Sequence, residues 1–298
     1  MPRIIDFHTH PYRPRDLAPG TWAFVRRISP AVREHGDRLD DPRYVAELLR
    51  AQGVERAVVL AEHCPQTSGD VRTETVLALC REVPDLFLPF ASVDPNTDPE
   101  PAALLRRYAA AGPVAGLKLY PSYQFFYPNE RRVYPIYEVC LELGIPVLFH
   151  IGSSVLPGTR LKYCDPIHLD DLAVDFPELV VVMAHGGRGF WYDACAFLAT
   201  HHRNFHIDIA GLVPARLREH FPDLEQLADK MVFGSDWPAM PKSVAHNARA
   251  IARLGLSEAA VGKILYGNAA RILKLEATPA PQRARSGPPA AEDDRARV

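Results

Sequence analysis

The sequence lacks three features that would place it in a special class of protein. It has 298 residues, but no apolar run comes near the roughly 18 residues that a membrane-spanning helix needs. Its formal net charge is only −2, so nothing points to nucleic acid or an anionic membrane as a partner. Its five cysteines are an odd number without a Cys-x-x-Cys motif, which indicates reduced thiols. We therefore expect a cytoplasmic protein that binds a small molecule, with a homodimer left open.

Three motifs are also missing. The N-terminus enters an apolar strand pattern directly and shows no signal peptide. No Gly-x-Gly-x-x-Gly follows an apolar run, so a dinucleotide site has no support. No Gly-x-Ser-x-Gly turn occurs, which disfavours a serine–histidine–aspartate triad.

What the sequence does contain is a regular alternation of apolar, β-branched runs with helical stretches such as 43–51, 101–111 and 133–143. This alternation predicts a parallel sheet with both faces covered. Eight such units predict one domain, an α/β (β/α)₈ TIM barrel over residues 1–277, with an open doubly wound sheet as the alternative. The predicted strands are Arg3–His8, Arg56–Glu62, Phe87–Asp94, Val114–Pro121, Pro146–Gly152, Leu179–Gly187, Phe205–Gly211 and Met231–Pro238.

Two segments break the rhythm. Residues 11–40 form a long insertion after the first predicted strand. Insertions of this length are often lids, although a surface excursion packed on its own helix fits the pattern equally well. Residues 278–298 combine prolines with mixed charges, which predicts a disordered tail outside the fold.

Ionisable side chains gather at the predicted C-terminal ends of the strands, where the active sites of such barrels lie. His8 and His10 end the first strand, and residues two apart on a strand point the same way. Two imidazoles so placed can clamp a divalent metal. Later strands end near Lys118, His150, His185 and Asp236.

Four motifs, in this order, resemble the amidohydrolase superfamily and in particular its amidohydrolase-2 branch of TIM-barrel metal-dependent hydrolases. They are His8-x-His10, Phe149-His150, Ala184-His185-Gly186-Gly187 and Gly234-Ser235-Asp236-Trp237-Pro238. The resemblance implies that the metal, or the water on it, contacts His8, His10, His150 and Asp236. It implies that His185 is either a further ligand or a catalytic imidazole. The expected cofactor is Zn²⁺, one ion rather than two, although Mn²⁺ or Fe²⁺ suits the same ligands.

The chemistry of these residue types agrees with such roles. A divalent ion held by imidazoles and a carboxylate lowers the pKa of its bound water toward about 7. Asp236 would take the proton of that water. His185 would polarise the substrate oxygen or stabilise a developing oxyanion.

Lys118 leaves three interpretations open. As an ammonium beside one metal it would be catalytic and hold a substrate carboxylate or carbonyl. As a carboxylated lysine, found in superfamily members with two metals, it would be a metal ligand that bridges both ions. As a purely structural residue it would bury an unpaired ammonium among the strand ends, which is costly.

Other side chains near the strand ends have less specific roles. Glu62 would orient a ligand histidine or cap a helix, and Gly211, close to Asp208, would leave room near the metal. The predicted substrate-binding residues are Lys118, Tyr120, Gln124, Tyr127 and Arg160. The aromatic members would form a pocket wall or pack the barrel rim, and the arginine would bind an anionic substrate or remain solvated.

These residues predict a metal-dependent hydrolase that cleaves a small lactone, amide or ester through a metal-activated water. The alternative is a metal-dependent decarboxylase or hydratase of a small aromatic or unsaturated carboxylic acid, which the resemblance allows because the same branch contains decarboxylases with this ligand set. A barrel that only binds its ligand is the third hypothesis.

Overall fold

The computed structural model describes residues 3–11 and 13–275. Eight parallel strands form one sheet whose spatial order follows the chain. The strands are buried almost throughout, as expected for a parallel sheet covered on both faces. They are β1 (Ile4–Thr9), β2 (Val54–Leu60), β5 (Phe87–Ala91), β6 (Gly116–Leu119), β7 (Val147–Gly152), β8 (Val181–Arg188), β9 (Phe205–Asp208) and β10 (Met231–Val232).

The sheet closes between its first and last strands. Asp236 donates its backbone N–H to the carbonyl of His8 at 2.9 Å, and His10 donates to the carbonyl of Trp237 at 2.9 Å. Thr9 and Trp237 form a parallel bridge. The predicted (β/α)₈ barrel is therefore confirmed. Closure also places His8 on β1, and His10 just after it, next to the segment that carries Asp236.

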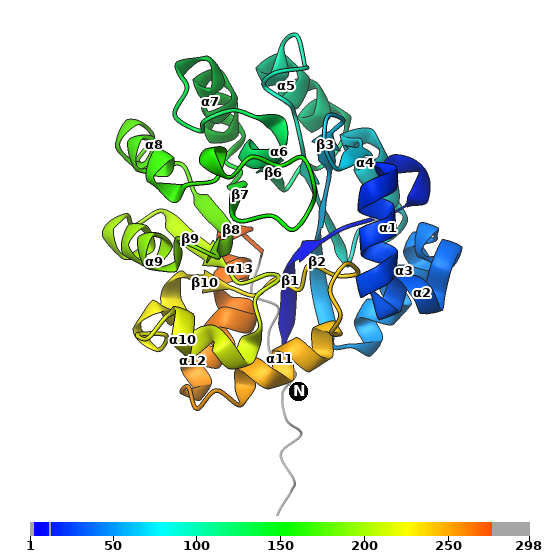
Figure 1. The fold of residues 1–298 in the computed structure, drawn as a ribbon, viewed down its shortest axis with the longest axis vertical. Coiled ribbons are helices and arrows are strands. Elements are labelled where there is room, and N and C mark those ends of the chain that lie inside the picture. The colour runs from blue at the N-terminus through cyan, green and yellow to red at the C-terminus, as the bar shows by residue number, and fades with distance from the viewer. Residues whose placement is uncertain (1–2, 12, 276–298) are drawn as a thin grey trace, which may run out of the picture.

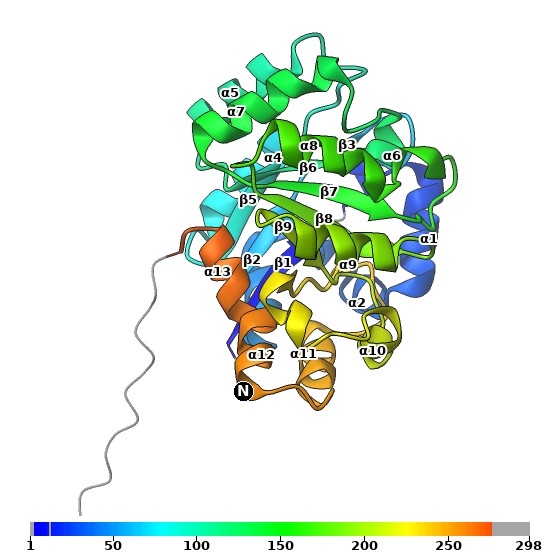
Figure 2. The same cartoon turned by 90° about the vertical axis from the view of Figure 1, so that its left-hand side faces the viewer.

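Helices surround the barrel on its outside, as Figures 1 and 2 show. The helical stretches predicted at 43–51, 101–111 and 133–143 agree with α3, α5 and α7 to within a residue. No helix in the described part of the chain is long and apolar enough to cross a membrane. The α-helices are α1 (Pro19–Ile28), α2 (Pro30–His35), α3 (Pro42–Ala51), α4 (Thr73–Glu82), α5 (Pro101–Ala111), α6 (Pro121–Gln124), α7 (Tyr134–Leu143), α8 (Asp170–Asp175), α9 (Tyr192–His201), α10 (Leu217–His220), α11 (Val244–Ala252), α12 (Glu258–Gly262) and α13 (Asn268–Ile272).

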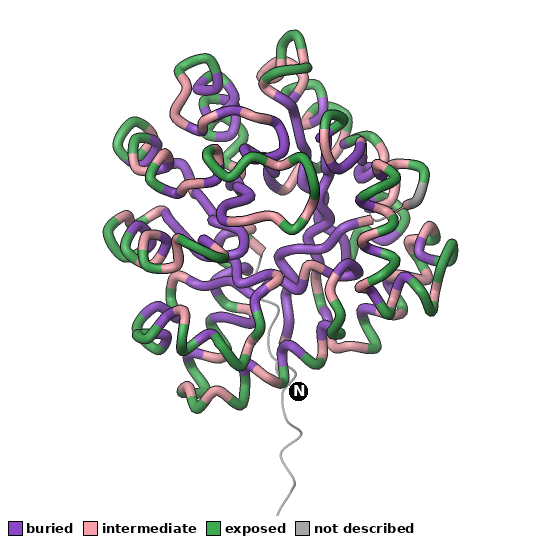
Figure 3. Tube along the Cα trace, viewed as in Figure 1, coloured by how far each residue is buried: buried purple, intermediate pink, exposed green. Residues whose placement is uncertain are grey.

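The core has an inner and an outer layer, and the strands of the barrel are mostly buried in Figure 3. Phe7 and Phe90 meet edge to face inside the barrel, with ring centroids 5.6 Å apart. A side chain at Gly116 would overlap the ring of Phe90, so this position on β6 needs glycine. The outer layer lies between the sheet and the helices. Aromatic rings therefore fill part of the barrel interior, and the polar residues lie at the C-terminal ends of the strands.

The insertion after β1 has structure of its own. It contains α1 and α2, and Ser29, at the start of α2, donates its hydroxyl to the carbonyl of Pro238 at 2.5 Å. This bond ties the insertion to the segment after β10. A short antiparallel hairpin of β3 (Glu62–Cys64) and β4 (Gly69–Val71) was not predicted. The predicted domain end at 277 and the predicted disorder of residues 278–298 lie outside the described residues.

Candidate metal centre

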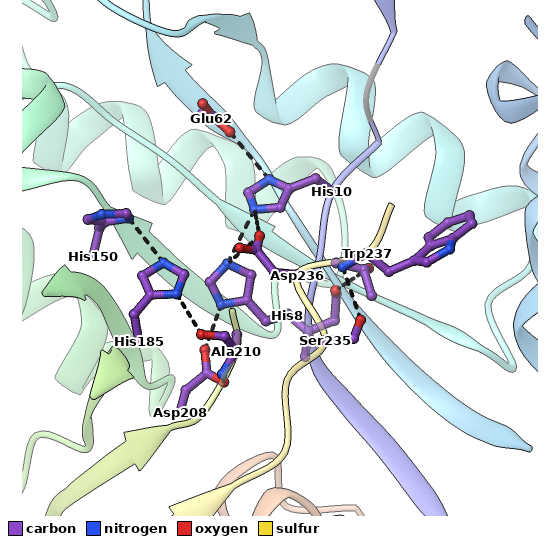
Figure 4. Close-up of polar contacts among 12 residues, drawn as sticks. His8, His10, Glu62, His150, His185, Asp208, Ala210, Ser235, Asp236 and Trp237 are labelled. Atoms are coloured by element: carbon purple, nitrogen blue, oxygen red, sulfur yellow. Dashed lines mark hydrogen bonds and ion pairs between the residues drawn. The ribbon is translucent and has the colours of Figure 1, made fainter. Parts of the chain in front are cut away.

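His8 of β1, His10 just after it and Asp236 after β10 bring three ligand atoms together (Figure 4). The Nε2 atoms of His8 and His10 lie 3.2 Å apart. Asp236 Oδ1 lies 3.3 Å from His10 Nε2 and 3.7 Å from His8 Nε2. Ligands bonded at about 2.0–2.2 Å to one ion stand roughly 3–3.5 Å apart. The three atoms are therefore spaced for one divalent ion.

Two buried carboxylates orient these imidazoles. Asp208 Oδ2 lies 2.6 Å from Nδ1 of His8, and Glu62 Oε2 lies 3.3 Å from Nδ1 of His10. An ionised carboxylate only accepts hydrogen bonds, so each imidazole turns its Nδ1–H outward and its Nε2 lone pair toward the centre of the cluster. Two lone pairs facing each other would repel, and a cation at the centre removes that repulsion, either a proton on His10 Nε2 that is shared with Asp236 or a metal ion in its place. Glu62 thus has the geometry of the histidine-orienting carboxylate that its position predicts.

The electrostatics of the cluster also favour a positive charge at its centre. Burial alone would lower the pKa of His10, but hydrogen bonds with Asp236 and Glu62 raise it to about 9. Burial alone would raise the pKa of Asp236, but the hydrogen bond from His10 and the nearby imidazoles hold it well below its usual range. Burial alone would also raise the pKa of Glu62, but its hydrogen bond with His10 holds it below its usual value. Asp236 and Glu62 are therefore both ionised at neutral pH, which suits a divalent ion.

A second pair of histidines lies beside the cluster. His185 Nδ1 donates to the carbonyl of Ala210 at 2.8 Å. Burial and the charge of Arg188 keep the pKa of His185 well below its ordinary value, so its Nε2 carries a lone pair. His150 Nδ1 then donates to that Nε2 at 3.2 Å. The Nε2 of His150 is left as a buried acceptor with no hydrogen-bond partner among residues 3–11 and 13–275. An acceptor in this state suits a metal or a donor group of a substrate.

The backbone at the site is held in an uncommon conformation. His185 and Asp236 have φ values of 65° and 60°, in the left-handed region that few non-glycine residues adopt. Asp6 supports the second of these turns, because it accepts the N–H of Ser235 at 2.9 Å and its hydroxyl at 2.5 Å. Left-handed residues that the surroundings enforce are typical of functional sites.

The cluster of His8, His10 and Asp236 lies in a cavity of about 220 Å³. A cavity of about 150 Å³ lined by apolar side chains is enough to admit benzene. The space therefore accommodates one substituted ring. Its apolar and aromatic walls are Phe24, Val25 and Ile28 of the insertion, Tyr120 and Tyr123 after β6, Val155 and Leu156 after β7, and Ala239 and Met240 after β10.

The family model described as amidohydrolase matches residues 5–275 of this chain. The chain belongs to the amidohydrolase-2 family. The family resemblance of the four sequence motifs is thereby confirmed. Comparison with curated proteins finds no match.

Solved structures of amidohydrolase-2 type share the fold. An uncharacterised TIM-barrel protein from Bordetella bronchiseptica is 27% identical with a TM-score of 0.77, over 91% of this chain and 98% of that one. A 5-carboxyvanillate decarboxylase from Novosphingobium aromaticivorans, complexed with manganese and a nitrobenzoic acid, is 19% identical with a TM-score of 0.68, over 92% and 96%. A dihydroxybenzoic acid decarboxylase from Polaromonas with bound manganese is 20% identical with a TM-score of 0.68, over 92% and 98%.

Within this amidohydrolase-2 site, Lys118 is fully buried and does not line the cavity, although it was predicted to bind substrate. Its neighbours Leu117 and Leu119 pack in the outer layer, so Lys118 points into the barrel. Its Nζ lies 4.9 Å from the ring centroid of Tyr120 and has no hydrogen-bond partner in the part of the chain that the structure describes. Burial lowers its pKa to about 8 although the carboxylate of Asp208 acts in the other direction. An amine in this state is readily neutralised, modified or paired with an anion.

Besides Lys118, three more of the predicted substrate-binding residues do not line the cavity. Gln124 is buried, and its amide bonds to backbone atoms of Tyr120, His63 and Val93. Tyr127 packs on aromatic rings outside the cavity, and Arg160 is exposed above a phenylalanine ring. Their side chains are therefore used in packing or face solvent. Tyr120, by contrast, lines the cavity as predicted.

Several residues at the site carry roles that the sequence did not assign. Asp208 orients His8, and Arg188 at the end of β8 lines the cavity. Phe24 and its neighbours on α1 make the insertion a wall of the cavity, which agrees with the lid interpretation. A lone aspartate inside an apolar strand was the one available signal for Asp208, because an unpaired buried carboxylate is costly.

Proposed function

We propose that the protein is a metal-dependent decarboxylase of a small aromatic carboxylic acid. The observation that carries this proposal is a ring-sized cavity with aromatic and apolar walls directly over the His8, His10 and Asp236 cluster. The decarboxylases of similar fold, with manganese and ring-shaped acids or inhibitors, support it. The hydrolase hypothesis has no comparable support among these structures.

The cluster residues would hold the metal, with the Nε2 of His150 as the candidate for a further ligand. When bound, a divalent ion supplies Lewis-acid polarisation of substrate oxygens. The donor set of imidazoles and carboxylate accepts Mn²⁺, Fe²⁺ or Zn²⁺. Manganese in the similar decarboxylases supports Mn²⁺, and Zn²⁺ stays a prediction.

Decarboxylation requires one proton at the ring carbon that bears the carboxylate. The carbon–carbon bond then breaks, its electron pair returns to the ring, and CO₂ leaves. Asp236 is placed to carry this proton, because its side chain is 14% exposed whereas those of His8 and His10 are more buried. Because its pKa is held well below its usual range, Asp236 rests as the carboxylate, so it would first take a proton from the substrate or from water and then pass it to the ring carbon.

The walls of the cavity position the ring and exclude water. Tyr123 packs edge-on against His150 with ring centroids 4.8 Å apart, which fixes the side of the cavity next to the second histidine pair. Phe24 lines the cavity on the side of the insertion. Holding a ring in one orientation over Asp236 converts a bimolecular proton transfer into an effectively unimolecular one.

A hydrolase of a small lactone, amide or ester is the second candidate. The ionised, partly open carboxylate of Asp236 is also placed to accept a proton from an attacking water. This candidate shares the metal cluster with the first and differs from it in the origin of the reacting oxygen.

The two functions are separated by product chemistry. Protein loaded with Mn²⁺ or Zn²⁺ is incubated with 2,6-dihydroxybenzoate and 5-carboxyvanillate, and separately with a lactone, an anilide and a phenyl ester. A decarboxylase releases CO₂, and in D₂O it leaves one deuterium on the ring carbon. Incorporation of ¹⁸O from labelled water without CO₂ release would favour the hydrolase. Neither activity with metal restored would support a binding barrel. A variant with His8→Ala and His10→Ala serves as the metal-free control.

A further inference from the structure

The cavity differs in character between its floor and its opening. Its ionisable lining side chains gather around the cluster of His8, His10 and Asp236, and all of them except Arg188 and Asp236 are buried. The lining side chains nearest to solvent are instead apolar, and we call them the apolar rim. They are Phe24, Ile28, Val155, Leu156 and Met240, each at least partly exposed. The cavity therefore has a polar floor and an apolar opening.

Three separate segments supply the apolar rim. Phe24 and Ile28 stand one turn apart on α1, so they share a face of that helix. Val155 and Leu156 follow β7, and Met240 follows β10. In Figure 2, α1 lies at the end of the barrel toward which β7 points. A group of exposed apolar side chains gathered around one opening is typical of a ligand-binding surface.

The segment after β7 holds Val155 toward solvent. The N–H of Ser153 donates to the carbonyl of Arg188 at 2.7 Å, which fixes the chain on one side of Val155. The N–H of Leu156 donates to the hydroxyl oxygen of Ser154 at 3.0 Å, which fixes it on the other side. The Val155 side chain is therefore held at the opening, 61% exposed, and does not fold back into the core.

The two tyrosines of the cavity wall offer rings to a ligand, because the protein already engages their hydroxyls. Tyr120 donates its hydroxyl to the carbonyl of Ala61 at 2.8 Å. The hydroxyl of Tyr123 is hydrogen-bonded to that of Ser154 at 2.6 Å. Within the described residues, a polar group of a ligand that reaches the apolar rim therefore gives up its water without meeting a polar rim side chain. Such a loss is unfavourable, whereas burial of an apolar group there is favourable.

We propose that the substrate is an aromatic acid with an apolar substituent, such as a short alkyl chain, on the side of the ring away from its carboxylate, and that the apolar rim binds this substituent. The proposal rests on the proposed function, in which the carboxylate end of the acid meets the metal ligands. The substituent covers apolar surface that otherwise faces water, and it fixes the ring along the axis of the cavity. The apolar rim is thus the part of the site that determines which ring is accepted.

Calorimetric titration of four simple acids into the Mn²⁺-loaded protein tests the apolar rim without turnover. The acids are benzoate, 4-methylbenzoate, 4-propylbenzoate and 4-hydroxybenzoate. Each added carbon is expected to tighten binding about fourfold, the effect of burying one CH₂ group at about 0.8 kcal/mol, so 4-propylbenzoate should bind about 60-fold more tightly than benzoate. The hydroxyl of 4-hydroxybenzoate should give no such gain. The heat-capacity change on binding should become more negative with chain length, because more apolar surface is buried.

Three variants assign the effect to the apolar rim. Val155→Ser removes two methyl groups and is expected to lower the ratio of 4-propylbenzoate to benzoate affinity about fourfold, with the metal content unchanged. Met240→Gln makes the apolar rim polar from the segment after β10 and should lower the same ratio, so its affinities decide if Val155→Ser does not fold. Val174→Ser is the matched control, because Val174 is 70% exposed on α8, outside the barrel, and all four affinities should stay at wild-type values.

The outcomes separate this proposal from the proposed function. Equal affinity for benzoate and 4-propylbenzoate in the wild type, tighter binding of 4-hydroxybenzoate than of 4-methylbenzoate, or a propyl preference that both rim variants leave intact would overturn the role of the apolar rim, whether or not CO₂ is released. A propyl preference that depends on the rim residues, with no CO₂ released from any aromatic acid, would overturn the decarboxylase and leave an apolar binding site.

Discussion

Replacement of Asp208 by asparagine is expected to weaken metal binding without touching a ligand atom. In the native site Oδ2 of Asp208 accepts from His8 Nδ1 at 2.6 Å, and its Oδ1 accepts from the N–H of Ala210 at 2.9 Å. An asparagine has one acceptor and one donor, so one of these two N–H groups must face an amide N–H. If the amide donor faces His8, the imidazole shifts its proton to Nε2 and loses the lone pair that a metal needs. If it faces Ala210, a buried backbone donor is left unpaired.

The expected loss in metal affinity is 10- to 100-fold, about 1.4–2.7 kcal/mol, which is the usual effect of removing such an orienting carboxylate. A competition titration of Mn²⁺ or Zn²⁺ against a chromophoric chelator measures it. Asp94→Asn is the matched control, because Asp94 is equally buried and accepts from the N–H of Asn96, away from the cluster. An Asp208→Asn variant that folds and binds metal as tightly as wild type would refute the role of the carboxylate in orienting His8.

Three further outcomes are expected. Gly234→Ala would place a Cβ 2.7 Å from His8 Cβ and overlap Asp208 Oδ1. It should therefore lower the free energy of unfolding by about 1–3 kcal/mol and lower the metal content measured by mass spectrometry. Wild-type values of both quantities would contradict this. Burial lowers the pKa of His206 to about 3, so between roughly pH 6.5 and 3 the unfolded chain binds more protons than the folded one, and stability falls as pH falls. His206→Leu should flatten the dependence of urea unfolding on pH by up to about 1.4 kcal/mol per pH unit, and an unchanged slope would count against a buried neutral imidazole. Lys118→Met removes a buried amine, so the melting temperature of the variant should equal or exceed that of the wild type while its activity falls. A drop in metal count from two to one per chain would favour the carboxylated, bridging lysine. Unchanged activity would favour a structural role.

Much of the fold could be predicted because each strand and helix has its own local pattern of apolar residues in the sequence. The eight apolar runs match the eight barrel strands in order, and the strand-end rule for such barrels then brings His8, His10 and Asp236 together. This part of the site depends on backbone topology alone. It needs no knowledge of how any loop folds.

Side-chain directions on the loops could not be predicted in the same way. Gln124 follows Lys118 closely in sequence, but α6 begins at Pro121 and turns its amide onto the backbone of neighbouring loops. In the sequence Arg160 and Arg188 look alike, because each is a cation in a segment that follows a predicted strand. Only the position of Arg188 at the end of β8 and its bonds to Ser153 place its charge at the cavity. The insertion was equally ambiguous, because a helix that packs over a site and one that packs on the surface share the same apolar periodicity.

The most direct test of the metal centre is anomalous diffraction from crystals of the protein grown with Mn²⁺. The account predicts one peak within about 2.0–2.3 Å of His8 Nε2, His10 Nε2 and Asp236 Oδ1. A structure at full Mn²⁺ occupancy whose peak lies elsewhere, or one without a peak at these three atoms, would contradict it.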